Sequence, residues 1–286
     1  MIPIESGILY IVATPIGNLE DITLRALRVL GNVDLILAED TRVSARLLRR
    51  FGITTPVRSF HEHNERKMAP AIVHRIERGA NIALISDAGT PLVSDPGFHL
   101  TRLLRERDGR IVPIPGPSAL ICALSAAGLP TDRFIFEGFP PSKREARRRW
   151  LQALAEEPRT LILYEAPHRV RATLQDMVET FGAERRGVIA KELTKTFETI
   201  RQGSLSALES WLQRDENHQK GEFVLMIGGT DLDSTQNTDA ATAEDLRVLR
   251  LLREELPLKK AVSLTARLTG RKRNDLYRLA LTMDEF

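Results

Sequence analysis

The chain has 286 residues, which is enough for about two domains. Hydrophobic residues make up 42% of it and charged residues 28%, so a wholly disordered chain is excluded and a buried core is expected. The net charge of +3 does not by itself indicate a polyanionic partner, and the single cysteine, Cys122, excludes an internal disulfide and a cysteine-rich zinc module.

The compartment is predicted from segments that the sequence lacks. No apolar run approaches the roughly 20 residues that span a bilayer, and the first residues carry no basic segment of the signal-peptide type. We therefore expect a soluble, cytoplasmic protein. Cys122 stands among Ala, Leu and Ile, which indicates a buried, unreactive thiol.

Strands and helices alternate in the first part of the chain. Short apolar runs predict strands, the intervening periodic segments predict helices, and Asp21 and Thr23 are possible helix caps. The strands are expected at 7–13, 33–38, 57–60, 81–86 and 111–114, with helices at 19–30, 43–51, up to 78 and from 98 onward. This alternation is typical of a mainly parallel sheet in an α/β domain.

A second α/β domain is expected after Pro117. An apolar helix over 119–127 is followed by strands near 134–139, 160–165, 187–190, 200–203 and 222–227. Here hairpins are plausible, so the second sheet is predicted to be mixed.

The composition changes again after residue 228. Residues 228–245 are rich in Ser, Thr, Asn and Asp and contain five acidic residues and no basic residue, which predicts a flexible linker. The tail is basic, and its residues Ala266, Gly270, Leu276 and Leu279 fall at a helix-turn-helix-like spacing, although Thr269 stands where an apolar residue is usual. The predicted domains are 1–117, 118–229, the linker 230–245 and a helical module at 246–286.

Six strand ends carry Gly, Pro and charged residues. They are 14–15, 39–42, 87–97, 115–118, 164–169 and 191–195. Open α/β sheets bind ligands at such strand ends, so the six loops predict a cleft between the two domains. No dinucleotide-binding, Walker A or serine-elbow motif is present. In the loop 87–97, Asp95 either contacts a ligand or caps the following helix.

A metal site is a weaker hypothesis. His61 and His63 would share one face of an extended strand and could bind a metal ion. Without a clear third ligand, ordinary surface polar residues are the better interpretation, and we predict no metal.

The strand-end motifs closely resemble those of the bacterial small-subunit ribosomal RNA methyltransferase I family, which belongs to the tetrapyrrole-methylase-like (class III) methyltransferases. The motifs are Ala13-Thr14-Pro15-Ile16-Gly17-Asn18, Ala38-Glu39-Asp40-Thr41-Arg42, Ser86-Asp87-Ala88-Gly89-Thr90-Pro91, Pro115-Gly116-Pro117-Ser118-Ala119, Tyr164-Glu165-Ala166-Pro167-His168-Arg169 and Lys191-Glu192-Leu193-Thr194-Lys195. The match spans roughly residues 7 to 229.

The resemblance implies two α/β domains with S-adenosylmethionine (SAM) in the cleft between them. It also implies methylation of the ribose 2′-hydroxyl of a cytidine in the decoding region of 16S rRNA, the C1402-type site, by a homodimer that acts on the small ribosomal subunit. By family position, the cofactor-binding residues are Pro15, Asp87, Ala88, Gly89, Thr90, Ser94, Ser118, Ala119, Tyr164, Leu193, Glu222 and Val224.

Methyl transfer from a sulfonium is an in-line displacement, so alignment supplies much of the rate. A base would help, because a ribose hydroxyl is a poor nucleophile at neutral pH. The candidates are Glu39, Asp40, Glu165, His168, Lys191 and Glu192, of which we favour Lys191 with Glu192 and keep Glu39. A structural ion pair is an equally good interpretation of Lys191 and Glu192.

Basic residues indicate the RNA contacts. Arg42 and Arg169 are candidate phosphate clamps, and the cluster around Lys143, Arg144, Arg147 and Arg148 is a candidate phosphate-tracking face with Trp150 as a stacking ring. The alternative for this cluster is a solvated helix face with Trp150 in the core.

In the tail, a tethered basic module would anchor RNA, through Lys259, Lys260, Arg271, Lys272 and Arg273. The alternative role is a dimer contact or a capping bundle.

Two other functions are considered for the whole protein, a precorrin-type methyltransferase of the same fold and a non-catalytic ribosome-binding module. The basic segments argue against the first, and the six intact loops argue against the second.

Overall fold

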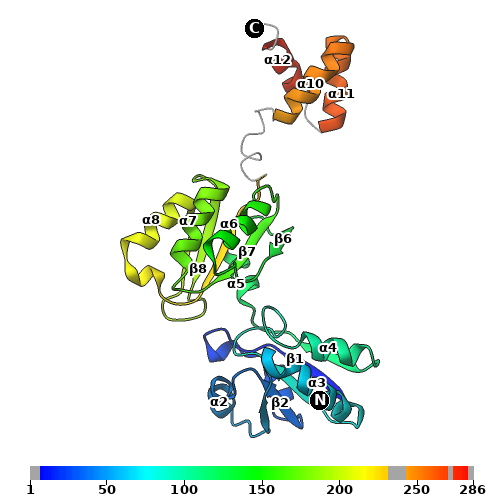
Figure 1. The fold of residues 1–286 in the computed structure, drawn as a ribbon, viewed down its shortest axis with the longest axis vertical. Helices are drawn as coiled ribbons and strands as arrows, with labels where there is room; N and C mark the ends of the chain where they lie inside the picture. The colour runs from blue at the N-terminus through cyan, green and yellow to red at the C-terminus, as the bar shows by residue number, and fades with distance from the viewer. Residues whose placement is uncertain (1–6, 231–242, 270–272, 283–286) are drawn as a thin grey trace. The chain divides into compact units, whose positions relative to one another are not determined.

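A computed structural model describes residues 7–230, 243–269 and 273–282. The chain divides into two units, Met1–Gly229 and Thr230–Phe286. The first unit holds two α/β domains and the second is helical (Figure 1). Each unit is described by itself.

The first sheet is entirely parallel, as the alternating pattern predicted. Its strands are β1 (Ile8–Val12), β2 (Leu35–Ala38), β3 (Val57–Ser59), β4 (Ile82–Ile85) and β5 (Arg110–Ile114), in the order β3-β2-β4-β1-β5. In a parallel sheet all carboxyl ends of the strands meet at one edge. The predicted loops after β1, β2, β4 and β5 are therefore brought together.

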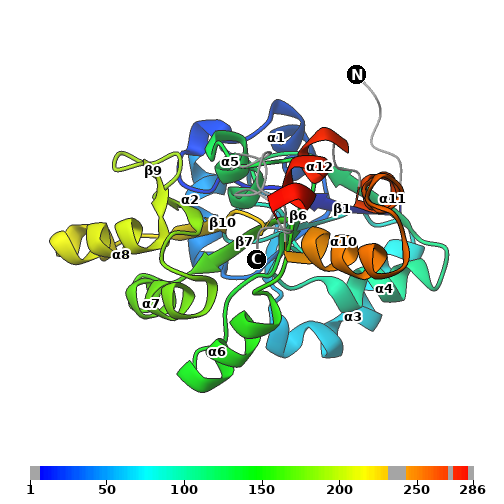
Figure 2. The ribbon, with the colours of Figure 1, turned by 90° about the horizontal axis from the view of Figure 1, so that it is seen from above.

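Helices cover both faces of this sheet. One core contains side chains of α1 (Leu24–Leu30) and α2 (Thr41–Arg50), and the other contains side chains of α3 (Glu62–Glu77) and α4 (Phe98–Arg105). Figure 2 shows α1 and α3 on opposite sides of β1. Burial on both faces explains why β1, β2 and β4 are continuous apolar runs.

The helix predicted over 19–30 is interrupted. A short 3-10 helix, η1 (Leu19–Asp21), is capped by the side chain of Asn18, and α1 begins only after Thr23, whose hydroxyl accepts from the backbone N–H of Ala26. Ile22 between them is extended. The expected cap at Thr23 is correct and that at Asp21 is wrong, because Asp21 lies inside the 3-10 turn.

The second sheet is mixed, as expected. Its strands are β6 (Phe134–Phe136), β7 (Thr160–Glu165), β8 (Arg186–Lys191), β9 (Thr199–Ser204) and β10 (Phe223–Ile227), in the order β6-β7-β10-β8-β9. β6 and β7 are parallel and the other pairs are antiparallel. Its core also receives side chains of α6 (Arg144–Ala153), α7 (Val170–Phe181) and α8 (Leu205–Arg214). The short helices α5 (Ala119–Ala126) and η2 (Glu216–Gln219) complete the domain.

The helical unit consists of α10 (Ala243–Glu255), α11 (Leu258–Thr269) and α12 (Arg273–Thr282). Its core is made by Leu249, Ala261, Val262, Leu276 and Ala280. Most of the predicted linker, 231–242, lies outside the described residues, as do Gly270, Arg271 and Lys272. In the part of the chain that the structure describes, no helix is both long and apolar enough to cross a membrane.

Candidate active site

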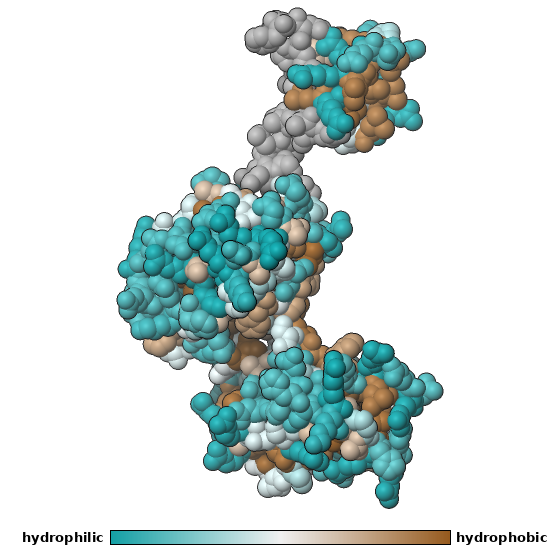
Figure 3. Space-filling model, viewed as in Figure 1, coloured by the Kyte–Doolittle hydropathy of each residue, from teal (hydrophilic) through white to brown (hydrophobic). Residues whose placement is uncertain are grey.

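A cavity of about 360 Å³ is lined by residues of both α/β domains. The space-filling view shows a hollow between these domains that is bordered by apolar side chains (Figure 3). Its wall from the first domain includes Ile16, Ala88, Gly89, Thr90, Val93, Ser94 and Asp95. Its remaining wall includes Ser118, Ala119, Phe139, Tyr164, Glu165, Ala166, Pro167, Leu193, Glu222, Phe223 and Val224.

The loop after β4 is fixed to the loop after β1. Thr14 and Gly89 exchange two backbone hydrogen bonds, of 2.8 and 3.0 Å, and the Thr14 hydroxyl donates to the carbonyl of Ser86 at 3.1 Å. Gly89 has φ +82°, a conformation that favours glycine. Its backbone N–H and C=O are therefore already bonded to Thr14. Because glycine has no side chain, this position leaves space in the cavity, but it offers no free hydrogen-bond donor.

Backbone strain gathers in two loops beside the cavity. Leu92 and Ser94 in the β4–α4 loop, and Glu192 and Thr194 in the β8–β9 loop, all have positive φ between 52° and 73°. Such conformations cost about 1–3 kcal/mol each for residues with a side chain, and they persist where the surroundings over-determine them, often at ligand sites. The conformation of these two loops therefore costs some stability.

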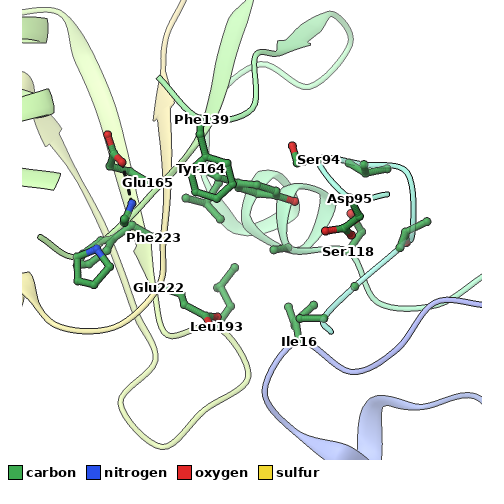
Figure 4. Close-up of a pocket in the computed structure, with 18 residues that line it drawn as sticks. Ile16, Ser94, Asp95, Ser118, Phe139, Tyr164, Glu165, Leu193, Glu222 and Phe223 are labelled. Atoms are coloured by element: carbon green, nitrogen blue, oxygen red, sulfur yellow. Dashed lines mark hydrogen bonds between the residues drawn. The ribbon is translucent and has the colours of Figure 1, made fainter. Parts of the chain in front are cut away.

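Tyr164 organises the opposite wall (Figure 4). Its hydroxyl oxygen accepts from the backbone N–H of Leu120 at 3.2 Å, and its ring packs edge-on against Phe136 and Phe139. Burial raises the pKa of this phenol, so it stays neutral. The result is an apolar aromatic wall with one fixed polar tip, as is typical of small-molecule sites.

The two α/β domains also touch beside the cavity, next to its lining residues Ile16 and Leu193. The backbone N–H of Asn18 donates to the Thr194 hydroxyl at 3.1 Å. At Gly17 an added Cβ would lie 2.5 Å from Cγ of Lys195 and 2.8 Å from Oγ1 of Thr194. A side chain at Gly17 would therefore push the two domains apart beside the cavity.

The structure places the predicted cofactor residues around this cavity, with two exceptions. Pro15 is buried and is not among the lining residues, and the Asp87 carboxylate accepts from the backbone N–H of Asp40 at 3.0 Å. Asp87 therefore ties the loop after β4 to the loop after β2 and is not part of the cavity wall. The lining residues that the prediction missed are mostly apolar, and Phe139 at the end of a predicted strand was the one recognisable signal.

The favoured catalytic pair does not reach the cavity. The Lys191 side chain is 8% exposed and its ammonium group donates to the carbonyl of Asn217 at 2.7 Å. The Glu192 carboxylate accepts from Lys195 at 2.9 Å and from the backbone N–H of Glu222 at 2.9 Å. These contacts favour the structural interpretation of the pair.

The other candidate bases differ in how free they are. Glu165 is buried and its carboxylate accepts from Arg169 at 2.7 Å, from the Thr173 hydroxyl at 2.5 Å and from the N–H of Ala166 at 2.8 Å. Asp40 is paired with Arg42, which holds the pKa of that carboxyl at about 2. Both groups are already bonded within the protein. His168 is exposed.

Glu39 and Asp95 are two further carboxylates to consider as bases, and the pKa of each is raised. Burial, together with the neighbouring charge of Asp87, raises the pKa of Glu39. Burial raises the pKa of Asp95 to about 6, helped by the charges of Glu39 and Asp87 and opposed by a hydrogen bond from Ser86. Asp95 lines the cavity and does not cap α4, whose N-cap residue is Gly97 and whose first turn receives the Glu65 carboxylate at the N–H of Leu100, 3.1 Å away.

The candidate RNA-binding residues fall into two groups. Arg147 is 4% exposed and bonded to Asp176, and the partly buried Arg169 is bonded to Glu165 and to the carbonyl of Pro140, so both guanidinium groups already have partners within the protein. The exposed residues are Arg42, Lys143, Arg144, Arg148, Lys259, Lys260 and Arg273. Of these, Arg144 and Arg148 also pair with Glu179.

Trp150 packs against the second-domain core, which matches the alternative interpretation of the ring.

The metal hypothesis for His61 and His63 rested on a strand that is absent. His61 is the N-cap of α3 and His63 lies in its first turn, because Asn64 completes a capping box with His61. Among the described residues no group of three or more His, Cys, Asp or Glu could hold a metal ion. Cys122 is partly exposed rather than buried.

Comparison with known proteins gives two family matches. Residues 8–209 match the model of the tetrapyrrole (corrin/porphyrin) methylases, and residues 239–284 match that of the RsmI C-terminal HTH domain. Two relatives named ribosomal RNA small subunit methyltransferase I, from Pseudomonas aeruginosa and Escherichia coli O157:H7, are 56% and 53% identical. The alignments cover 97% of this chain in both cases, and 98% and 96% of the relatives.

Solved structures share the fold at low identity. Uroporphyrin-III-C-methyltransferase from Thermus thermophilus aligns with a TM-score of 0.55 at 20% identity, over 78% of this chain and 94% of that one. Diphthine synthase aligns with a TM-score of 0.59 at 13% identity, over 78% and 90%.

Proposed function

The chain belongs to the tetrapyrrole (corrin/porphyrin) methylase family and, within it, to the ribosomal RNA small subunit methyltransferases I; on that premise we propose that it methylates the ribose 2′-hydroxyl of a cytidine in 16S rRNA. The coarser statement follows from the family, namely that the chain is a SAM-dependent methyltransferase of small-subunit ribosomal RNA. The choice of a cytidine ribose in the decoding region, the C1402-type site, is part of the proposal.

The observation that carries the proposal is the cavity between the two α/β domains. Its volume of about 360 Å³ lies within the range of about 300–1,000 Å³ that is usual for small-molecule sites. The apolar side chains of Ile16, Leu193 and Val224 and the ring of Tyr164 suit an adenine.

We assign cofactor binding to the predicted residues that line this cavity, and an indirect role to Pro15 and Asp87. When bound, SAM supplies an activated methyl group. The residues of the chain hold the two reactants in line and exclude water, which is where most of the rate comes from in such a displacement.

The precorrin-type alternative is not favoured. The chain aligns almost from end to end with relatives named as ribosomal RNA methyltransferases, and its C-terminal segment matches a domain model named for that group. The structures of tetrapyrrole-type enzymes share the fold at 20% identity or less, which says nothing about the substrate.

RNA is the proposed partner of the exposed basic residues. Arg42, Lys143, Arg148, Lys259 and Arg273 are exposed, so they can meet phosphates without unfolding the protein. Arg271 and Lys272 lie outside the described residues, and their assignment stays a prediction from sequence. We place the protein in the cytoplasm because its substrate, the small ribosomal subunit, is there.

A homodimer is also part of the proposal. Exposed apolar side chains support it, since Leu24 is 86% exposed, Phe197 is 74% exposed and Ile121 is 51% exposed. The backbone N–H of Asn18, the cap residue of η1, donates to the Thr194 hydroxyl at 3.1 Å, so η1 and the β8–β9 loop, which carries Phe197, lie close together. Sedimentation equilibrium of the full chain tests this point, and a monomer at micromolar concentration would contradict it.

The decisive experiment combines binding with mapping of the product. Calorimetry should detect SAM binding by the protein alone. Incubation with unmethylated 30S subunits and SAM should place the new methyl group on a ribose oxygen of a cytidine, as read by nuclease digestion and mass spectrometry. A methyl group on a base would refute the proposed reaction, and absence of SAM binding would refute the site.

A further inference from the structure

A second cavity, of about 530 Å³, adjoins the cavity between the two α/β domains, which is called the cofactor cavity from here on. The two share the residues Ser94 and Asp95 of the β4–α4 loop, so this loop forms a common wall. In the close-up of the first cavity, Ser94 and Asp95 face Tyr164 and Phe139 (Figure 4). The second cavity is completed by Glu39, Glu62, His63, Glu65, Arg66, Pro96, Phe98 and His99.

One part of the wall of this second cavity has side chains that could bind a nucleobase and a phosphate. Phe98 is 60% exposed, which is unusual for a phenylalanine and leaves its ring free to stack. Beside it, His99 packs edge-on against that ring at 5.5 Å, and the guanidinium of Arg66 donates to Nε2 of His99 at 3.0 Å. An exposed aromatic ring next to an arginine matches the chemistry of a single nucleotide.

Carboxylates make up another part of the wall. Glu39 comes from the end of β2, and Asp95 comes from the loop shared with the cofactor cavity. A carboxylate can accept a proton from a ribose hydroxyl, or a hydrogen bond from the exocyclic amine of cytosine. These groups would repel a phosphate, so the occupant must turn its neutral sugar and base toward them and its phosphate toward Arg66.

We propose that this second cavity, here named the acceptor cavity, receives the target nucleotide of the RNA, with Phe98 stacking on its base and Asp95 acting as the base toward its ribose hydroxyl. The inference rests on the proposed function and adds to it the site of the acceptor and the identity of the general base. It replaces Lys191 and Glu192, which the fold places elsewhere.

The chemical step balances without a further reactant. The ribose oxygen forms a bond to the methyl carbon, the carbon–sulfur bond breaks, and its electron pair stays on sulfur, which becomes a neutral thioether. The proton of the hydroxyl passes to the carboxylate of Asp95. A flanking position between the two cavities is what such a proton acceptor requires.

The electrostatic surroundings of Asp95 suit this role. With a pKa of about 6, the carboxylate is ionised at neutral pH and holds a proton more readily than an ordinary aspartate. Charged and titratable groups of the first domain near it, or lining the same cavities, are Glu39, Asp40 and Arg42 from the β2–α2 region, His61, Glu62, His63, Glu65 and Arg66 from α3 and its cap, and Asp87 and His99 from the β4–α4 region. From the second domain, Tyr164, Glu165 and Glu222 line the cofactor cavity together with Asp95.

The stacking part is tested with Phe98→Ala and the control Val57→Ala, which trims another exposed apolar side chain of the same domain. Phe98→Ala should weaken binding of 30S subunits by about 10-fold in filter-binding assays and leave SAM binding by calorimetry unchanged. Val57→Ala should leave both unchanged. Binding of 30S by Phe98→Ala as tightly as wild type would overturn the stacking role.

The base is tested by single-turnover methylation of 30S subunits at saturating protein and SAM. Asp95→Asn should slow the rate by at least about 10²-fold while binding of SAM and 30S stays within a few-fold of wild type. Asp95→Glu, which keeps a carboxylate but moves it, should recover part of the rate. Wild-type rates in Asp95→Asn would overturn the assignment.

The pH profile separates Asp95 from its neighbour Glu39. The wild-type rate should fall below about pH 6, because protonation of Asp95 removes the acceptor. This fall should persist in Glu39→Gln and disappear from the residual rate of Asp95→Asn. If it disappears in Glu39→Gln and persists in Asp95→Asn, Glu39 is the base and the proposal is wrong.

The same assays distinguish the two levels of the hypothesis. If wild-type protein places no methyl group on RNA, the proposed function fails. If wild-type protein methylates a ribose but Phe98→Ala and Asp95→Asn bind and react as wild type does, the proposed function stands and the acceptor cavity alone is refuted.

Discussion

The Lys191 ammonium group is held inside the second domain and does not line the cavity between the two α/β domains. It donates to the carbonyl of Asn217 in η2, and the adjacent Glu192 holds Lys195 and the backbone of Glu222. A hydrogen bond from a charged donor contributes more than a neutral one, on the order of 1.5–3 kcal/mol. At the residue scale the Lys191-Glu192 motif therefore fixes the end of β8 next to Leu193, which lines the cofactor cavity.

We predict that Lys191→Met lowers the free energy of unfolding by about 1–2 kcal/mol, because it removes this charged hydrogen bond while the exposed Asn217 can turn to water. Below the melting transition the single-turnover methylation rate should stay within about threefold of wild type. Urea unfolding and the 30S methylation assay measure the two quantities. A rate loss above 100-fold with unchanged stability would show that Lys191 is the base after all.

At the element scale, α4 depends on a residue from another helix. Its N-cap residue is Gly97, which has no side chain to cap it, and the Glu65 carboxylate of α3 accepts from the N–H of Leu100 instead. Glu65 is 3% exposed. This bond fixes the start of α4, and with it the β4–α4 loop that separates the two cavities.

We predict that Glu65→Ala destabilises the protein by about 1–2 kcal/mol, as expected for loss of a helix cap, and weakens SAM binding because the β4–α4 loop is less well held. Glu65→Gln keeps an acceptor oxygen and should retain most of both quantities. Thermal unfolding and calorimetry measure them. Equal SAM affinity in Glu65→Ala and wild type would show that the cap does not act on the loop.

The basic face of α6 is divided between packing and solvent. Arg147 is buried against Asp176 of α7, which is itself 1% exposed, and Arg144 bonds the other carboxylate oxygen. Lys143 at the N-cap is exposed. Within this one run of basic residues, Arg147 therefore packs inside the domain and Lys143 faces solvent.

We predict that Arg147→Met lowers stability by about 3 kcal/mol, because it leaves the buried carboxylate of Asp176 less compensated. Its affinity for 30S subunits should not change. In contrast, Lys143→Ala should change stability by less than about 0.5 kcal/mol and reduce the salt dependence of RNA binding by about one phosphate contact. The reverse pattern would mean that α6 is oriented differently from this structure.

At the scale of the whole molecule, the chain combines a catalytic unit with a separately folded helical unit. The first unit contains both cavities, and the second has its own core around Leu249, Val262 and Leu276. Because neither core needs residues of the other, the two units should fold separately. A tethered basic module raises the local concentration of the RNA it binds without entering the chemistry.

We predict that a chain ending at Gly229 keeps its SAM affinity within about threefold but shows a KM for 30S subunits that is at least about 10-fold higher, with kcat little changed. Calorimetry and steady-state methylation measure these values. An unchanged KM would assign the helical unit another role, such as a dimer contact.

The fold class, the six strand-end motifs and the family could all be inferred from the sequence. These depend on local pattern, because apolar runs of strand length alternate with helical periodicity and because Gly, Pro and Asp at strand ends are read directly from the chain. In a parallel sheet those ends must meet, so a cleft at the strand ends could be predicted before the structure, whereas the individual residues expected to line it came from the family resemblance.

Which charged residues face the cavities depends on the tertiary structure. Asp95 and Phe98 become part of an acceptor cavity through the turn at Gly97, whereas Lys191 and Arg147, equally prominent in the sequence, turn inward to Asn217 and Asp176. The direction of a side chain depends on strand register and helix rotation, and these are fixed by packing between residues far apart in the chain. That is why the motifs indicated which loops surround the cavities, while the fold was needed to show which side chains line them.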